Sequence, residues 1–383
     1  MNNLLKSSIE TWFKKTLEKK DSKKILFLLI FWPFSFLFKL GSLCFHYLYD
    51  KKFLTQESVN IPICSIGNIV LGGVGKTPIV LLLGQALEEK VPLAIISRGY
   101  HSSLEKANAP FLLSKDNGPV MSAHHAGDEP YFLATKLPKA KVIVGKNRVK
   151  AAELCQKCDT KLILLDDAMQ HRRLKRDFEI VVLDSQNLFG YFRHFPCGLL
   201  RESPKGLRRA NLIICNHTEE NQNLDELKEK IKPFTKAPIV FTRYKMDPLQ
   251  DIQTLNPIVL DKEPIAVFAA IGNPFRFKSM LEKEEFKIVN TFFLHDHAFV
   301  SRKLLDSFAL KSKELGAKAI VVTEKDAVKI NKNWKIALPI AVAPISTEII
   351  QGKEIWDLTI NHLLSLSLKK EMDPLKDNCF FTR

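Results

Sequence analysis

A glycine-rich segment near residue 70 constrains the fold of this chain more than any other feature. The apolar stretch 61–66 leads into it, and a stretch with helical spacing of apolar residues follows over 78–90. A strand, a glycine turn and a helix in this order let backbone N–H groups and the helix N-terminus face a polyphosphate. The segment therefore predicts a nucleotide-binding loop made of Gly72, Gly73, Val74, Gly75, Lys76, Thr77 and Pro78.

The residue types within this loop agree with the prediction. Lys76 would reach the outer phosphates, and the Thr77 hydroxyl would bind Mg²⁺. Pro78 suits the first turn of a helix, where its missing N–H costs least. Val70 stands where the standard pattern has a glycine, so the match is to the variant Gly-Gly-x-Gly-Lys-Thr form. A glycine turn that only joined a strand to a helix would leave Lys76 and Thr77 unexplained.

A second acidic element follows further along the chain. The apolar stretch 162–165 ends in two carboxylates, Asp166 and Asp167. At the carboxyl end of a strand beside a phosphate loop, an aspartate can hold Mg²⁺ directly or through water. Asp166 and Asp167 therefore join Thr77 as predicted metal ligands, and the division of roles between the two aspartates stays open.

The remaining pattern is that of an α/β protein. Apolar runs that predict strands alternate with helical segments such as 147–157; the runs lie at 93–97, 142–144, 161–165, 179–183 and 212–214. This alternation predicts a P-loop NTPase-type fold with a mostly parallel sheet and helices on both faces. Three X-Pro pairs within 243–264 indicate a linker, and a second strand–helix series runs from 265 to 343.

We therefore expect three parts: a basic N-terminus with a membrane-associated helix at 1–52, a nucleotide-binding domain at 53–245, and a smaller α/β domain at 246–383 that closes the active-site cleft.

The N-terminus carries an uncharged run of fourteen residues, 25–38, between lysines. As a helix this run would rise about 21 Å, short of the roughly 30 Å of a bilayer core. Extending the run to Tyr49 makes it long enough to span a bilayer but places Lys39 inside the apolar segment. Trp32 and the flanking lysines are typical of an anchor that lies in the membrane interface. We expect such an anchor slightly more than a spanning helix; a buried core helix is the other alternative.

Composition limits the choice of partner. Lys and Arg number 57 against 42 Asp and Glu, a net charge of +15, and hydrophobic residues make up 46%, enough for globular cores. A basic globular protein meets a nucleic acid, an anionic membrane or a phosphorylated substrate. Seven scattered cysteines favour free thiols in a reducing compartment over a disulfide framework.

One alternative function fits the loop. Partitioning-type ATPases that dimerise on DNA also use a Gly-Gly-Val-Gly-Lys-Thr loop, but they carry a further lysine before the two glycines, where this chain has Leu71. That function predicts DNA binding that weakens steeply with salt.

Ordered landmarks over roughly 60–330 resemble those of the tetraacyldisaccharide 4′-kinases, which phosphorylate a lipid A precursor in Gram-negative bacteria. Any one landmark is weak, but eight in the same order are specific. They are Gly67-Asn68 with the phosphate loop, Ser97-Arg98-Gly99-Tyr100, Gly127-Asp128-Glu129-Pro130, Asp166-Asp167-Ala168-Met169-Gln170-His171, Gly198-Leu199-Leu200-Arg201-Glu202, Ile271-Gly272-Asn273-Pro274, Asp296-His297 and Thr323-Glu324-Lys325-Asp326.

The resemblance implies a lipid kinase of lipopolysaccharide biosynthesis that uses ATP and Mg²⁺. It would transfer the γ-phosphoryl group to the 4′-hydroxyl of a tetraacylated glucosamine disaccharide 1-phosphate. The enzyme would sit on the cytoplasmic face of the bacterial inner membrane, held by its N-terminus, with no nucleic-acid partner and no obligate protein partner.

The resemblance also implies roles for individual residues. Asp128 would be the general base and His297 its partner, whereas the residues alone would equally allow Asp128 to be a turn or N-cap aspartate. Glu129 would bind the metal. If His297 meets Asp128, the site lies in a cleft between the domains. Gln170 and His171 follow the two aspartates and would line the phosphate cleft, or else only form a hydrogen-bonded loop between strand and helix. Arg98 and Arg201 could each bind phosphate through a guanidinium fork, and we prefer Arg201. The role of Thr323–Asp326 stays unexplained.

Overall fold

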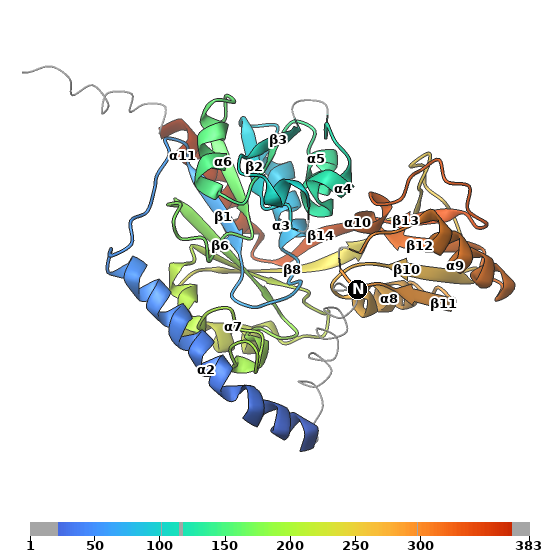
Figure 1. Cartoon of the computed structure of the whole chain (residues 1–383), viewed down its shortest axis with the longest axis horizontal. Coiled ribbons are helices and arrows are strands. Elements are labelled where there is room, and N and C mark those ends of the chain that lie inside the picture. The colour runs from blue at the N-terminus through green and yellow to red at the C-terminus, as the bar shows by residue number, and fades with distance from the viewer. Residues whose placement is uncertain (1–21, 101, 115–117, 297, 370–383) are drawn as a thin grey trace, which may run out of the picture.

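The computed structural model describes residues 22–100, 102–114, 118–296 and 298–369, which form two lobes side by side (Figure 1). The large lobe comprises the described residues of 53–246 and 345–369, and the smaller lobe those of 247–344. The lysine-rich stretch before residue 22 and the predicted base partner His297 lie outside the described residues.

A nine-stranded sheet forms the centre of the large lobe. Its strands in spatial order are β14 (Ile345–Gln351), β8 (Ile239–Met246), β7 (Leu212–Asn216), β6 (Phe178–Asp184), β1 (Ile63–Gly67), β5 (Leu162–Asp166), β2 (Leu93–Ser97), β4 (Lys141–Val144) and β3 (Phe111–Ser114). All neighbours pair in parallel except at the two edges, where β14 and β3 are antiparallel. The predicted mostly parallel α/β sheet is thus confirmed.

Helices cover both faces of this sheet, because its central strands are apolar on both sides. The helices of the large lobe are α3 (Lys76–Leu87), α4 (Ala123–Ala126), α5 (Asp128–Lys136), α6 (Arg148–Gln156), α7 (Leu224–Ile231) and α11 (Lys353–Lys369). Apolar residues of α3, α5 and α11 join one core, and those of α6 join the core on the opposite face. Short 3₁₀ turns connect some of these elements at Leu104–Lys106, Gly190–Phe192, Pro204–Arg209 and Lys232–Phe234.

The smaller lobe has its own five-stranded sheet and its own cores. Its strands in order are β11 (Ile288–Phe293), β10 (Ile265–Ala269), β12 (Ala319–Thr323), β13 (Ile340–Ala343) and β9 (Gln250–Asp251). Helix α8 (Pro274–Lys283) packs in one core and α9 (Arg302–Glu314) in the other, and the short α10 (Glu324–Ala327) follows β12.

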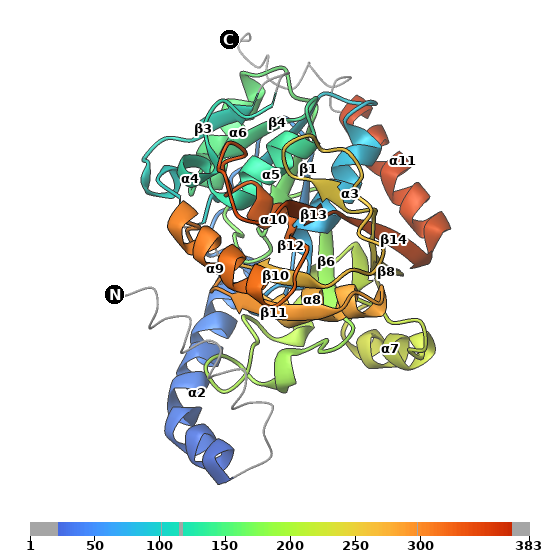
Figure 2. The same ribbon diagram turned by 90° about the vertical axis from the view of Figure 1, so that its right-hand side faces the viewer.

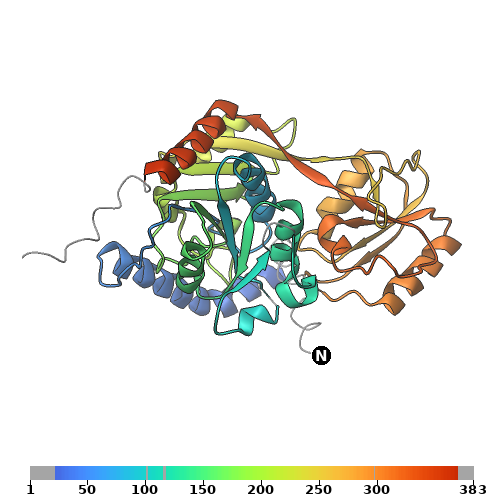
Figure 3. The same ribbon diagram turned by 90° about the horizontal axis from the view of Figure 1, so that it is seen from above.

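The two lobes are joined by the antiparallel pair β8 and β14, in which Met246 lies opposite Ile345. The chain leaves the large lobe along β8 and returns along β14 into α11, which packs on the large sheet (Figure 3). The expected smaller domain at 246–383 is therefore too long, because residues 345–369 belong to the large lobe. The expected linker at 243–264 is also partly wrong, because it contains the end of β8 and all of β9.

Helix α2 (Ser22–Asp50) lies along one flank of the large lobe (Figure 2). It is long and apolar enough to cross a membrane, and only 11% of its most apolar window is buried. Its exposed large side chains include Leu29, Ile30, Trp32, Phe34, Phe36, Leu37, Leu40 and Tyr47. The alternative of a buried core helix therefore does not hold.

Candidate active site

The glycine-rich loop joins β1 to α3, as the order of apolar and glycine residues predicts. Gly75 takes the position before the first turn of α3 with a φ of 85°, in the left-handed region that favours glycine. A Cβ atom at Gly75 would collide with the Tyr244 hydroxyl and the Asn216 amide. Asn216 in turn donates to the carbonyl of Val74 at 3.1 Å, so the end of β7 supports the loop from behind.

One cleft of about 2250 Å³ contains nearly all the residues that the sequence analysis selected. The selected residues that line it are Gly72, Gly73, Gly75, Lys76, Thr77, Pro78, Asp128, Glu129, Asp166, Asp167, Gln170, His171 and Arg201. Val74 is buried beneath the loop. Although His297 lies outside the described residues, its neighbours Asp296 and Ala298 line the same cleft.

The two aspartates after β5 differ in their surroundings. Asp166 is buried and accepts a hydrogen bond from the Ser97 hydroxyl at 3.2 Å. Burial, reinforced by the negative charges of Glu129 and Asp167, raises the pKa of Asp166 to about 7. Burial also opposes ionisation of Asp167, but Lys76 and Arg201 outweigh it and lower the pKa of Asp167 to about 2.

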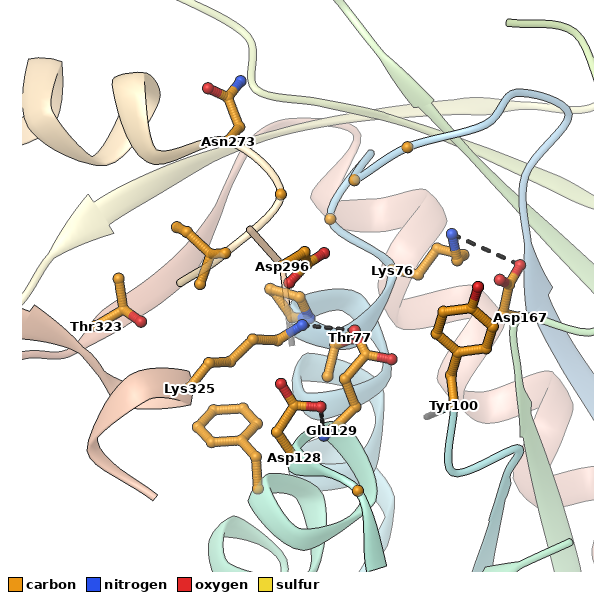
Figure 4. Close-up of a pocket in the computed structure, with 18 of the residues that line it drawn as sticks. Lys76, Thr77, Tyr100, Asp128, Glu129, Asp167, Asn273, Asp296, Thr323 and Lys325 are labelled. Atoms are coloured by element: carbon orange, nitrogen blue, oxygen red, sulfur yellow. Dashed lines mark hydrogen bonds and ion pairs between the residues drawn. The ribbon is translucent and has the colours of Figure 1, made fainter. Parts of the chain in front are cut away.

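The ionised Asp167 forms contacts with two cationic side chains. Asp167 lies 3.6 Å from the Lys76 ammonium (Figure 4). It also accepts a hydrogen bond from Arg201 Nη1 at 2.9 Å. An ionised Asp167 therefore holds two cations at the phosphate end of the cleft, where both can meet phosphate oxygens.

The predicted base and metal ligand come from the first turn of α5. Asp128 is only 7% exposed, and its Oδ1 accepts from the backbone N–H of Glu129 at 3.0 Å. Glu129 Oε1 accepts from the Thr77 hydroxyl at 3.2 Å, which brings the predicted metal ligands of α3 and α5 together. Asp128, Glu129 and Thr77 lie close together, and the Lys325 side chain extends toward them from the other side of the cleft (Figure 4).

Two lysines of the smaller lobe contact these carboxylates, and the sequence analysis did not select either. The Lys325 ammonium donates to Glu129 Oε1 at 2.5 Å, and the Lys329 ammonium lies 3.4 Å from Asp128 Oδ2. Burial opposes the charge of Lys325, but Glu129 and Asp128 outweigh it and raise its pKa. The only signal for Lys325 was the family landmark at Thr323–Asp326, whose role was unexplained, and Lys329 lies outside that landmark.

Gln170 and His171 lie at the wall of the cleft. The Gln170 amide donates to the carbonyl of Asn68 at 2.7 Å and to Glu202 at 2.8 Å, so it ties the phosphate loop to the Arg201–Glu202 segment. Burial, together with nearby arginines, lowers the pKa of His171 to about 4. His171 is therefore neutral at pH 7 and can bind a ligand by hydrogen bonding rather than by charge.

Comparisons with known proteins show which family the chain belongs to. The model of the tetraacyldisaccharide-1-P 4′-kinase family matches residues 27–364. The chain belongs to this family. It is 32% identical to the tetraacyldisaccharide 4′-kinase of Elusimicrobium minutum over 87% of this chain and 92% of the relative. It is 34% identical to that of Pasteurella multocida over 79% of this chain and 87% of the relative.

A solved structure has the same fold. LpxK of Aquifex aeolicus, crystallised in complex with ATP, superimposes with a TM-score of 0.69 at 25% identity. The match covers 87% of this chain and 98% of that one. The chain is accordingly a phosphotransferase of lipid A biosynthesis, a tetraacyldisaccharide 4′-kinase, and this assignment displaces the alternative of a DNA-associated ATPase.

Proposed function

We propose that this kinase transfers the γ-phosphoryl group of ATP, with Mg²⁺, to the 4′-hydroxyl of a tetraacylated glucosamine disaccharide 1-phosphate. The observation that supports this most is the composition of the cleft. The wall that carries Lys76 and Asp128 continues to Phe27, Phe31 and Phe38 of α2. A single cleft thus offers cations for phosphates, a carboxylate for a hydroxyl and an apolar end for acyl chains.

The donor set supports Mg²⁺ as the metal. Thr77, Glu129, Asp166 and Asp167 offer oxygen atoms only, which magnesium prefers. Among the described residues, no three His, Cys, Asp or Glu side chains converge on one point. That arrangement suits a metal that takes one or two carboxylates and completes its shell with nucleotide phosphates and water. When bound, Mg²⁺ would neutralise charge on the transferring phosphates.

Asp128 is our proposed general base. It is nearly buried, it begins α5 opposite the phosphate loop, and a carboxylate there can accept the proton of a sugar hydroxyl. His297 stays the proposed partner, supported by the position of Asp296 and Ala298 in the cleft wall. Lys76 and Arg201 would hold the phosphates during transfer.

We further propose that α2 lies in the membrane interface on the cytoplasmic face of the inner membrane. Its contacts with the body extend over most of its length. The Cys197 thiol donates to the carbonyl of Leu28 at 3.8 Å, and the Ser35 hydroxyl donates to that of His194 at 2.7 Å. Arg172 pairs with Asp50 at 2.7 Å. A helix docked along its length cannot be surrounded by lipid, so the outward apolar face would enter one leaflet only.

The kinase reaction is tested with purified full-length protein, γ-labelled ATP, Mg²⁺ and a tetraacylated disaccharide 1-phosphate in mixed micelles. We expect label in a bisphosphate whose new phosphate is at the 4′ position. The same disaccharide with its 4′-hydroxyl blocked is the control and should accept no label. ATP turnover that leaves the lipid unlabelled would contradict the proposal.

Membrane seating is tested by flotation with vesicles that contain anionic phospholipid. Trp32→Ser with Phe36→Ser should weaken binding, because both side chains are exposed on α2. Leu358→Ser is the control: Leu358 is at least as exposed as Trp32 and Phe36, but it lies on α11, on the opposite side of the large lobe (Figure 3). Equal loss in both variants would mean that binding does not depend on the α2 face.

A further inference from the structure

The segment 323–329 of the smaller lobe contacts α5, the helix that carries the proposed base. It leaves β12, forms α10 and faces α5 of the large lobe. Three ion pairs connect the two segments, namely Glu324–Lys136, Lys325–Glu129 and Lys329–Asp128. Two of the three involve the consecutive carboxylates at the start of α5.

Lys329 is held in place by its own lobe. Its ammonium lies 3.1 Å from Asp326 Oδ1 and donates to the carbonyl of Ala270 at 3.0 Å. Asp326 is fully buried, and its other oxygen accepts from the N–H of Ala270 at 3.1 Å. The Thr323 hydroxyl donates to that same oxygen at 2.8 Å. The ammonium therefore has a fixed position relative to the smaller sheet.

The same ammonium faces Asp128 across the lobe boundary at 3.4 Å. The side chains of Lys329 and Asp128 are 10% and 8% exposed, so solvent screens the pair only weakly. A nearly buried carboxylate requires a compensating partner, and the smaller lobe supplies one here.

We propose that Lys329 is a positioning residue for phosphoryl transfer, which orients the Asp128 carboxylate when the smaller lobe is docked. This inference rests on the proposed role of Asp128 as general base. Lys329 acts through Asp128. The consequence is that the base reaches its working position only in the docked arrangement, so that chemistry depends on docking of the two lobes.

Testing the inference requires a variant that folds. Lys329→Met alone would leave Asp326 buried without its cation, a strongly destabilising change. The double variant Asp326→Asn with Lys329→Met removes both charges of that local pair, and the Asn side chain can still accept from Thr323. Lys136→Met is the matched control, because it breaks an ion pair between the same two segments without touching Asp128.

The measurement is single-turnover transfer to the tetraacylated disaccharide 1-phosphate, with ATP affinity and thermal unfolding recorded separately. We expect the double variant to transfer roughly 10–100-fold more slowly, the loss typical when the partner that orients a functional side chain is removed. ATP affinity should be unchanged, because the phosphate loop is intact. Lys136→Met should lose far less activity.

The decisive comparison is made in an Asp128→Asn background. If Lys329 acts through Asp128, adding the double change there should cause little further loss, whereas independent effects would multiply. Multiplied losses, or a double variant as fast as the parent, would overturn the inference. If the double variant does not fold, Lys329→Arg is combined with Asp128→Asn in the same way. This variant keeps a cation beside Asp326 but moves it relative to Asp128. Failure of the unmodified protein to label the lipid would instead overturn the proposed function.

Discussion

The two walls of the cleft hold their functional groups by different means. On the large-lobe wall, the phosphate loop and Asp166–Asp167 follow neighbouring strands, β1 and β5, whose carboxyl ends meet at one edge of the sheet. On the smaller-lobe wall, side chains reach across the lobe boundary to distant acceptors. These contacts are Arg276 to Asp184, Lys325 to Glu129 and Lys329 to Asp128.

With the roles proposed above, this difference would separate phosphate binding from chemistry. The groups of the large-lobe wall are positioned by the backbone of a single sheet, so their arrangement would persist if the lobes moved apart. The smaller-lobe contacts exist only while a second sheet, joined through β8 and β14, is docked. We therefore expect changes on the first wall to weaken ATP binding, and changes at the contacts of the second wall to slow transfer while ATP binding persists.

The largest effect should come from Asp128→Asn, at the point where the walls meet. The variant keeps the size of the side chain but removes the carboxylate that would accept the hydroxyl proton. A positioned general base contributes about 10²–10⁴-fold, so single-turnover transfer should fall within that range. ATP affinity, measured by equilibrium binding, should change little. If transfer were unaffected, the base role would pass to another group, with Glu129 the first candidate.

Lys76→Ala should be the next largest and should also weaken ATP binding. Lys76 begins α3 at the phosphate end of the cleft, and loss of a positioned contact to developing charge costs roughly 10²-fold or more in turnover. Lys278→Ala removes a lysine from an exposed pair on α8 and is the control for charge alone. An unchanged ATP affinity in Lys76→Ala would break the distinction between the two walls.

The distinction between local structure and contacts across the lobes also explains which parts of the fold and site the sequence could predict. The predicted strand 93–97 coincides with β2, the predicted strand 212–214 lies within β7, and the predicted helix at 78–90 overlaps α3. These elements, and the loop between β1 and α3, depend on consecutive residues and their periodicity. The loop residues other than the buried Val74 therefore line one cleft.

What the sequence could not predict depends on contacts between distant residues. The return of β14 to β8 pairs Ile345 with Met246, and no local pattern marks that partner. Lys329 meets Asp128 from a different lobe, and Arg276 meets Asp184 in the same way. A lysine or arginine is ordinarily a solvated side chain, so only the fold reveals these contacts.

The smallest effect should come from Arg276→Gln, which loosens the lobes far from the carboxylate pair. Arg276 Nη2 lies 3.0 Å from Asp184 Oδ2, and Nη1 lies 2.7 Å from His217 Nδ1. Both ion-pair partners are partly exposed, so we expect a loss in kcat/KM of roughly fivefold, about 1 kcal/mol. ATP affinity should stay near its original value.

The loss in kcat/KM of the Arg276→Gln variant should also depend on pH. Burial lowers the pKa of His217, and Arg276 lowers it further, against the attraction of Asp184; the Tyr244 ring packs against the imidazole. Removing Arg276 removes one of the causes that lower the pKa of His217, so as the pH falls the variant binds a proton there at a higher pH than the parent does. Protonated His217, 3.1 Å from Asp184, then replaces part of the lost cation. The ratio of variant to parent kcat/KM should therefore rise as the pH falls below neutral. Arg243→Gln, which breaks exposed pairs with Glu220 and Glu348 within the large lobe, should show no such dependence. A ratio that is flat with pH for Arg276→Gln would mean that His217 does not share the Asp184 contact, and that Arg276 alone holds this edge of the smaller lobe.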